Sequence, residues 1–257
     1  MKRILPLLIP RPVRAYASRL QQYPDLQLRL RNLEIAVDVL LRNRTYTASE
    51  DVGFNGQRIR KKIFEELLST ITFDVIVETG TEIGNTTGYL AEQSKLPIYT
   101  VDSNPPFYSI AKMRLASFSS IHFELSDSRE FISKLAVSHL SGQCVFFYLD
   151  AHRYDDLPIK EEIDLIVRYW TNFVIMVDDF RVPNDKGYVY DNYGKNGVLS
   201  IEHIRGSLGK HNLIPFFPST PAEKETGQKR GCVVVARHEG FADKIEKLNS
   251  LTSAEGF

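Results

Sequence analysis

The sequence has few cysteines, no long apolar run and no excess of either charge. Its two cysteines, Cys144 and Cys232, each lie within a short apolar stretch. We therefore expect buried free thiols in a reducing compartment, and neither a disulfide framework nor a zinc site. No apolar run approaches the roughly 20 residues of a membrane-spanning helix, so we expect no stable membrane insertion. The 32 basic and 32 acidic residues balance, which disfavours a nucleic-acid-binding protein.

The N-terminal segment differs in charge from the rest of the chain. It begins MKRILPLLIPRP, which resembles a signal peptide, but two prolines interrupt the apolar patch and no small-residue cleavage site follows, so we expect a cytoplasmic protein. Residues 1–44 carry a net charge of +6 and the remaining 213 residues carry −6. Helical spacing of apolar residues over 26–41 predicts an amphipathic helix. We interpret its basic face as solvated or as a contact for a homo-oligomer, and binding to a membrane surface is the less favoured alternative.

From residue 58 onward, short apolar segments alternate with amphipathic ones. This alternation predicts a doubly wound α/β fold with a parallel sheet covered on both faces. We place an N-terminal helical extension at 1–57 and the main domain at 58–257. Two final strand-like segments, separated by a polar stretch, predict a terminal hairpin. The predicted strands are 73–78, 97–102, 121–125, 144–150, 172–179, 213–219 and 231–238, and the predicted helices are 58–71, 86–94, 107–118, 128–140, 157–170 and 200–211.

A stretch with three glycines, ETGTEIGNTTG (78–88), lies at the end of the first predicted strand. Glycines allow a tight turn and close approach to a ligand, and the next helix offers unpaired N–H groups. Glu82 stands where a dinucleotide fingerprint has its second glycine, and its carboxylate would repel a pyrophosphate. Glu78 suits a cationic amino group, as in S-adenosylmethionine (SAM). The alternative is an ordinary strand-to-helix turn. The candidate cofactor residues in this loop are Glu78, Gly80, Thr81, Gly84 and Thr86.

Further candidate cofactor residues follow the second and third predicted strands. Asp102, with Ser103 beside it, ends the second strand, where an acidic side chain can accept the hydroxyls of a ribose. Asp127 and Ser128 follow the third strand and could contact an adenine edge. An N-cap for the next helix is an equally favoured role for this pair.

Three aspartates end the fourth and fifth predicted strands. Asp150 ends one, and Asp178 and Asp179 end the other. If the two strands are neighbours, the three carboxylates converge and a divalent cation such as Mg²⁺ would compensate their charge. Asp150 would also lie beside the cofactor. The alternative is that one or two of them cap a helix or pair with Arg153 or Arg181.

Taken together, these motifs resemble the class I SAM-dependent methyltransferases. Within that class they are most similar to the cation-dependent O-methyltransferases, and in particular to the macrocin and mycinamicin sugar O-methyltransferases. The resemblance covers about 58–238 and implies a sheet of about seven strands in the order 3-2-1-4-5-7-6, the last strand antiparallel. It implies metal ligation by Asp150, Asp178 and Asp179, and a catalytic base at His152. Ala151 departs from the pattern, because the sugar enzymes tend to have glycine there.

The resemblance implies a SAM-dependent and cation-dependent O-methyltransferase that acts on a hydroxyl of a sugar or a glycosylated small molecule. The loop 181–197 would contact this acceptor, and its Tyr188, Tyr190 and Tyr193 could stack on a sugar face or an aromatic ring. Two alternatives remain open at this point. One is a nicotinamide-dependent oxidoreductase on a similar fold, and the other is a non-catalytic binding protein on a methyltransferase fold.

Overall fold

The computed structural model describes residue 37 and residues 53–152, 156–238 and 240–253. The chain divides into two units, residues 1–44 and residues 45–257. The predicted amphipathic helix at 26–41 lies outside the described residues, apart from Val37. Among the described residues, no helix is long and apolar enough to cross a membrane.

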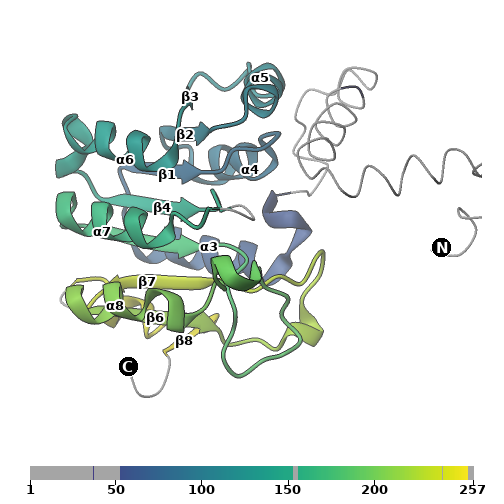
Figure 1. Cartoon of the computed structure of the whole chain (residues 1–257), viewed down its shortest axis with the longest axis vertical. Coiled ribbons are helices and arrows are strands. Elements are labelled where there is room, and N and C mark those ends of the chain that lie inside the picture. The colour runs from purple at the N-terminus through teal and green to yellow at the C-terminus, as the bar shows by residue number, and fades with distance from the viewer. Residues whose placement is uncertain (1–36, 38–52, 153–155, 239, 254–257) are drawn as a thin grey trace, which may run out of the picture. The chain divides into compact units, whose positions relative to one another are not determined.

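The larger unit is built on one eight-stranded sheet with the order β3-β2-β1-β4-β5-β7-β6-β8 (Figure 1). The strands β1 to β5 run parallel to one another, whereas β7 runs antiparallel to both of its neighbours, β5 and β6. The predicted order is therefore confirmed, with one further strand beside β6. The strands are β1 (Val75–Thr79), β2 (Ile98–Asp102), β3 (Ile121–Leu125), β4 (Val145–Leu149), β5 (Phe173–Val177), β6 (Leu213–Pro218), β7 (Val233–Arg237) and β8 (Leu251–Ser253).

Helices cover both faces of this sheet. On one face, α6, α7 and α8 pack on alternate strand residues, and we call this layer the α7-side core. On the other face, α3, α4 and α9 pack on the intervening residues, and we call this layer the α3-side core. The central strands β1, β4 and β5 are buried along their whole length, as expected for parallel strands between two helical layers. The helices are α3 (Arg58–Thr70), α4 (Asn85–Ser94), α5 (Pro105–Arg114), α6 (Ser128–Ala136), α7 (Ile159–Tyr169), α8 (Ile201–His211) and α9 (Ala242–Ile245).

The short turn η3 (Gly53–Gly56) belongs to the main unit, although the sequence analysis places it in the N-terminal extension. The ring of Phe54 is fully buried in the α3-side core. It packs edge-on against Tyr89 and Tyr148, with ring centroids 5.4 and 5.2 Å apart. A single buried aromatic ring therefore places the boundary of the main unit before residue 53.

The C-terminal part of the chain contains two elements that the sequence analysis does not predict, α9 and β8. β8 pairs with β6 and becomes the edge of the sheet. Both elements are too short to show a hydrophobic period. The two cysteines are free thiols. Cys232 is buried, as predicted, whereas the prediction of a buried Cys144 is wrong, because this residue is partly exposed immediately before the start of β4.

Candidate functional site

The candidate site lies at the carboxyl ends of β1, β4 and β5. The chain proceeds from β1 toward β3 on one side and from β4 toward β5 on the other. Strand order therefore reverses between β1 and β4, which is where open α/β sheets bind ligands. The structure brings the ends of these strands together, as the sequence analysis expects.

Glu78 is fully buried near the end of β1. One carboxylate oxygen accepts hydrogen bonds from the hydroxyls of Thr87 and Thr100, each at 2.6 Å. The other oxygen, Oε1, is buried and has no hydrogen-bond partner among the described residues. Burial raises the pKa of Glu78 to about 7, although the two hydroxyls act in the opposite direction. A buried acid with an unused oxygen fits a cationic group of a ligand.

The loop between β1 and α4 depends on its glycines. Gly80 has φ of +90°, and a Cβ atom there would lie 2.4 Å from the carbonyl oxygen of Asp150. Gly84 has φ of +80°, and its Cβ would lie 2.6 Å from a methyl group of Leu115. Glu82 also has a positive φ, of 48°. The backbone here therefore turns in the conformation that favours glycine and packs closely on the end of β4.

Asp102 connects this loop to the end of β2. Its Oδ2 accepts a hydrogen bond from the backbone N–H of Glu82 at 2.8 Å, and its Oδ1 accepts one from Asn104 at 2.7 Å. Both oxygens of this buried carboxylate therefore accept backbone hydrogen bonds. Ser103, the next residue, is exposed. This arrangement is compatible with the predicted ribose contact.

The remaining predicted cofactor residues make contacts within the protein. The hydroxyl of Thr81 lies 2.6 Å from that of Thr100, and the hydroxyl of Thr86 accepts a hydrogen bond from the backbone of Phe54. Asp127 caps α6 and pairs with Arg129, as the N-cap alternative predicts. Ser128 is buried at the start of α6. A cofactor contact by these four residues stays a prediction.

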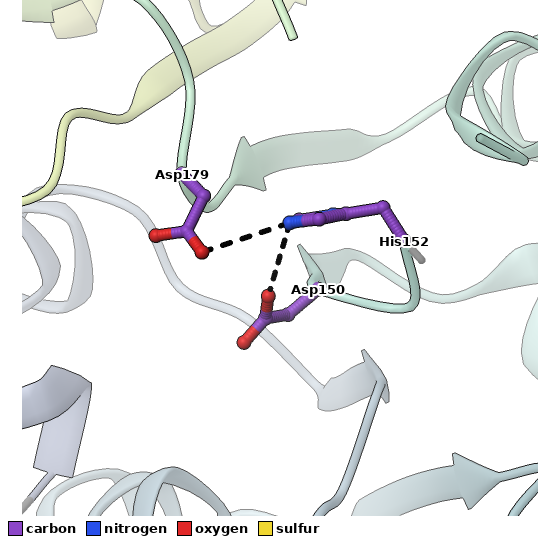
Figure 2. Close-up of side chains that lie close together, drawn as sticks. All are labelled: Asp150, His152 and Asp179. Atoms are coloured by element: carbon purple, nitrogen blue, oxygen red, sulfur yellow. Dashed lines mark ion pairs between the residues drawn. The ribbon is translucent and has the colours of Figure 1, made fainter. Parts of the chain in front are cut away.

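Asp150, His152 and Asp179 form the centre of the site (Figure 2). Nε2 of His152 lies 3.5 Å from Oδ1 of Asp150 and 3.8 Å from Oδ2 of Asp179. These distances are longer than a hydrogen bond. The imidazole side chain is 5% exposed, and Nε2 has no hydrogen-bond partner among the described residues. A buried nitrogen that faces carboxylates across this spacing leaves a polar group for a ligand to satisfy.

Asp178 does not join this group, although the sequence analysis places it there. Its side chain is buried and forms an ion pair with Arg60 of α3 and a hydrogen bond with the hydroxyl of Tyr148. Alternation along the strand explains the separation. Val174 and Met176 of β5 face the α3-side core, and Asp178 continues that face. Asp179 has φ of 54°, which turns the chain so that its carboxylate lies at the sheet edge with His152.

Burial and mutual charge shift the pKa values of the central group. Burial and the negative charge of Asp179 hold the pKa of Asp150 well above its ordinary value, and His152 opposes them. Burial lowers the pKa of His152. Asp179, Asp150 and Asp191 together raise this pKa by more than burial lowers it, so the net shift is upward. Burial also raises the pKa of Asp179, yet His152 and Arg230 lower it below its ordinary value. The charge on each of the three groups therefore affects the pKa of the other two.

Two residues that the sequence analysis does not predict, Asp191 and Arg230, complete the site. Oδ2 of Asp191 lies 3.6 Å from Nε2 of His152. The guanidinium of Arg230 forms ion pairs with both Asp179 and Asp191. Asp191 lies in the loop 181–197, which we call the acceptor loop. In the sequence, the only indication that Asp191 belongs to the site is that it is an acidic residue among tyrosines.

The tyrosines of the acceptor loop differ in position. Tyr188 is buried, and its hydroxyl donates to the carbonyl of Thr220. Tyr190 lies beneath the guanidinium of Arg181. Tyr193 donates to Asp191, and its ring centroid lies 6.4 Å from that of His152. Of the three rings, that of Tyr193 is the one beside the central group.

The central group fits a divalent cation in its donor chemistry. One ligand atom from each of Asp150, His152 and Asp179 can lie within 4.8 Å of the others. Carboxylate oxygens suit Mg²⁺ and Mn²⁺, and imidazole nitrogen suits several transition metals. The buried Nε2 without a hydrogen-bond partner among the described residues supports this fit. Arg230 already compensates part of the negative charge.

No protein-family model matches the chain, and no curated protein matches its sequence. Solved structures match its fold. The O-methyltransferase from Bacillus cereus in complex with SAH is 15% identical, with 88% of this chain and 97% of that chain covered and a TM-score of 0.52. The O-methyltransferase TomG from Streptomyces achromogenes, in complex with SAM, is 15% identical, with 69% and 79% covered and a TM-score of 0.50. The chain therefore has the fold of the class I SAM-dependent methyltransferases, as its motifs predict.

Proposed function

We propose that this protein is a SAM-dependent O-methyltransferase that requires a divalent cation and methylates a hydroxyl of a sugar or a glycosylated small molecule. The observation that carries the proposal is the buried Nε2 of His152, which faces Asp150 and Asp179 at the carboxyl edge of this fold. The two similar structures, described as O-methyltransferases and solved with SAH or SAM, support the choice of cofactor and reaction.

On the cofactor side, the β1–α4 loop and the end of β2 would hold SAM. The unused oxygen of Glu78 would receive the ammonium group, and Asp102 would accept hydrogen bonds from the ribose hydroxyls. Because Gly80 has no side chain, this loop can lie against the backbone of Asp150. The cofactor would therefore lie directly beside the carboxylates of the central group.

On the acceptor side, Asp150 and Asp179 would hold the cation, and His152 would act as the base. When bound, a divalent cation lowers the pKa of a coordinated hydroxyl. His152 would accept the proton of that hydroxyl, since its Nε2 faces the same space. Neutralising the carboxylates would also remove the interactions that raise the pKa of His152, and this would favour the neutral imidazole that a base requires. Orientation of the acceptor oxygen toward the methyl group would supply much of the rate.

The acceptor loop would place Tyr193 and Asp191 against the acceptor. The ring of Tyr193 beside His152 suits stacking on a sugar face, and a carboxylate suits hydrogen bonding to hydroxyls. Tyr188 has a structural role instead, because its ring is buried. Asp178 likewise has a structural role, so we propose Asp150 and Asp179 as the cation ligands without it.

The proposal can be tested with purified full-length protein. Calorimetry should show SAM binding in the presence of EDTA, and methyl transfer to a panel of vicinal-diol sugars should stop when EDTA is added and return with Mg²⁺ or Mn²⁺. Asp150→Asn should bind SAM and lose cation-dependent turnover. Full turnover in EDTA would refute the cation requirement. Saturable NADH binding without SAM binding would instead support the oxidoreductase alternative.

A further inference from the structure

Arg230 is held in place beside the central group by Gln57, the N-cap residue of α3, and by Arg60 within α3. The side-chain amide of Gln57 donates to the backbone carbonyl of Arg230 at 2.7 Å and accepts from its backbone N–H at 3.0 Å. Arg60 donates to the carbonyl oxygens of Arg230 and Gly231. Both the backbone N–H and the backbone carbonyl of Arg230 are therefore hydrogen-bonded, which fixes the point from which its guanidinium extends into the site.

The guanidinium of Arg230 binds one oxygen of each of two carboxylates. It pairs with Oδ1 of Asp179 and Oδ1 of Asp191, whereas the Oδ2 atoms of both residues face His152. The three side chains are between 14% and 21% exposed. The ion pairs are consequently shielded from solvent. Charges in such a position interact more strongly than charges at the surface.

We propose that Arg230 is the resident counter-cation of this site and that its charge sets the affinity for a divalent cation. The inference rests on the proposed function, because it concerns the cation that Asp150 and Asp179 would hold. A cation bound by Asp150 and by Oδ2 of Asp179 would lie close to the fixed positive charge of Arg230, which binds Oδ1 of Asp179. Repulsion between the two would weaken cation binding, and the ion pairs with Arg230 would keep the carboxylates compensated when no cation is bound.

A purely positioning role for Arg230 makes the opposite prediction. Partners that hydrogen-bond to metal ligands orient them, and their loss lowers metal affinity about 10- to 100-fold. If Arg230 acted in this way, any substitution that removed its forked geometry would weaken cation binding. The sign of the change therefore separates a charge effect from a geometric one.

The experiment is a calorimetric titration of metal-free, full-length protein with Mn²⁺, without acceptor. We expect Arg230→Gln, which removes the charge, to bind Mn²⁺ at least about tenfold more tightly than the wild type. Arg230→Lys, which keeps the charge and loses the fork, should bind within about threefold. Arg168→Gln, a matched loss of one positive charge on an exposed residue of α7, should leave the affinity unchanged. A SAM titration of each variant checks that the fold is intact.

The outcomes distinguish this inference from the proposed function. Equal or weaker Mn²⁺ binding by Arg230→Gln, or a tenfold loss in Arg230→Lys, would overturn the role of Arg230 while leaving the cation site in place. If no variant and no wild-type protein bound Mn²⁺ while all bound SAM, the cation requirement and this inference would both be wrong. Arg230→Met, which also removes the charge, takes the place of the Gln variant if that variant does not fold, and the same tightening of Mn²⁺ binding is expected.

Discussion

The guanidinium of Arg60 forms an ion pair with the carboxylate of Asp178 in the interior of the protein, and both side chains are 1% exposed. The pair joins α3 to the end of β5, and the hydroxyl of Tyr148 in β4 donates to the same carboxylate. Burial of two charges is costly, so such a pair is tolerated only when each charge has its partner. The ion pair and this hydrogen bond hold the carboxylate of Asp178 in the interior, away from the central group to which the carboxylate of Asp179 belongs.

Removal of one partner of this pair should strongly destabilise the protein. Arg60→Met leaves Asp178 charged and buried, and Asp178→Asn does the same to Arg60. We expect each to lower the free energy of unfolding by about 3–5 kcal/mol, measured by urea denaturation. The double variant should cost less than the sum, because neither charge remains alone. A loss below about 1 kcal/mol in both single variants would show that the pair contributes little.

Much of the sheet could be predicted from the sequence. The strand segments are short and apolar, and five of them are followed by a polar or acidic residue that marks the carboxyl edge. This pattern is local, so it can be read without knowledge of the fold. The glycine loop after β1 and the acids Asp102 and Asp150 were placed at this edge for the same reason, and the structure brings them there.

The partners of the charged residues could not be predicted in this way. Asp178 and Asp179 are adjacent in sequence, but their cationic partners Arg60 and Arg230 lie far away in the chain on either side. Alternation along β5 indicates that the two carboxylates diverge. It does not indicate which face carries an arginine, because that depends on how α3 and the segment before β7 pack. The prediction of three convergent carboxylates failed to account for this alternation.

The raised pKa of Glu78 should make SAM binding depend on pH. At pH 6 a carboxyl with a pKa of about 7 is mostly protonated, and it becomes ionised as the pH rises. Since an ammonium group favours the ionised form, affinity should increase by about fivefold between pH 6 and pH 7.5, and should decline above pH 8 as the amino group loses its proton. Calorimetric titrations across this range would measure the change.

Glu78→Gln provides the control for this pH dependence. It keeps a polar side chain that Thr87 and Thr100 can hydrogen-bond, but it does not titrate. SAM binding by this variant should be weaker and nearly constant between pH 6 and pH 7.5. An increase in affinity equal to that of the wild type would assign the titration to another group, of which Glu162, also buried with a pKa of about 7, is the first candidate.

Substitution of His152 should separate catalysis from binding. If His152 is the base, His152→Gln should lower kcat by about 10²–10⁴ and leave the affinities for SAM and Mn²⁺ within a few-fold of the wild type. His122→Gln is a suitable control, because that histidine is exposed on β3 and stacks on Tyr99. A loss of Mn²⁺ affinity in His152→Gln would instead make the imidazole a metal ligand, as its place beside Asp150 and Asp179 also allows.

Two glycine-to-alanine substitutions should have opposite effects on stability, because Gly80 lies against the backbone of Asp150 whereas Gly206 has open space around it. In Gly80→Ala the new methyl group would meet the backbone of Asp150 at 2.4 Å, at a φ of +90°, so the loop must shift. We expect a loss of about 2 kcal/mol or more in the free energy of unfolding, together with weaker SAM binding. Gly206 lies inside α8, and its Cβ would meet no atom within 4 Å. Gly206→Ala should therefore stabilise the protein by about 0.5–1 kcal/mol, because alanine favours the helix.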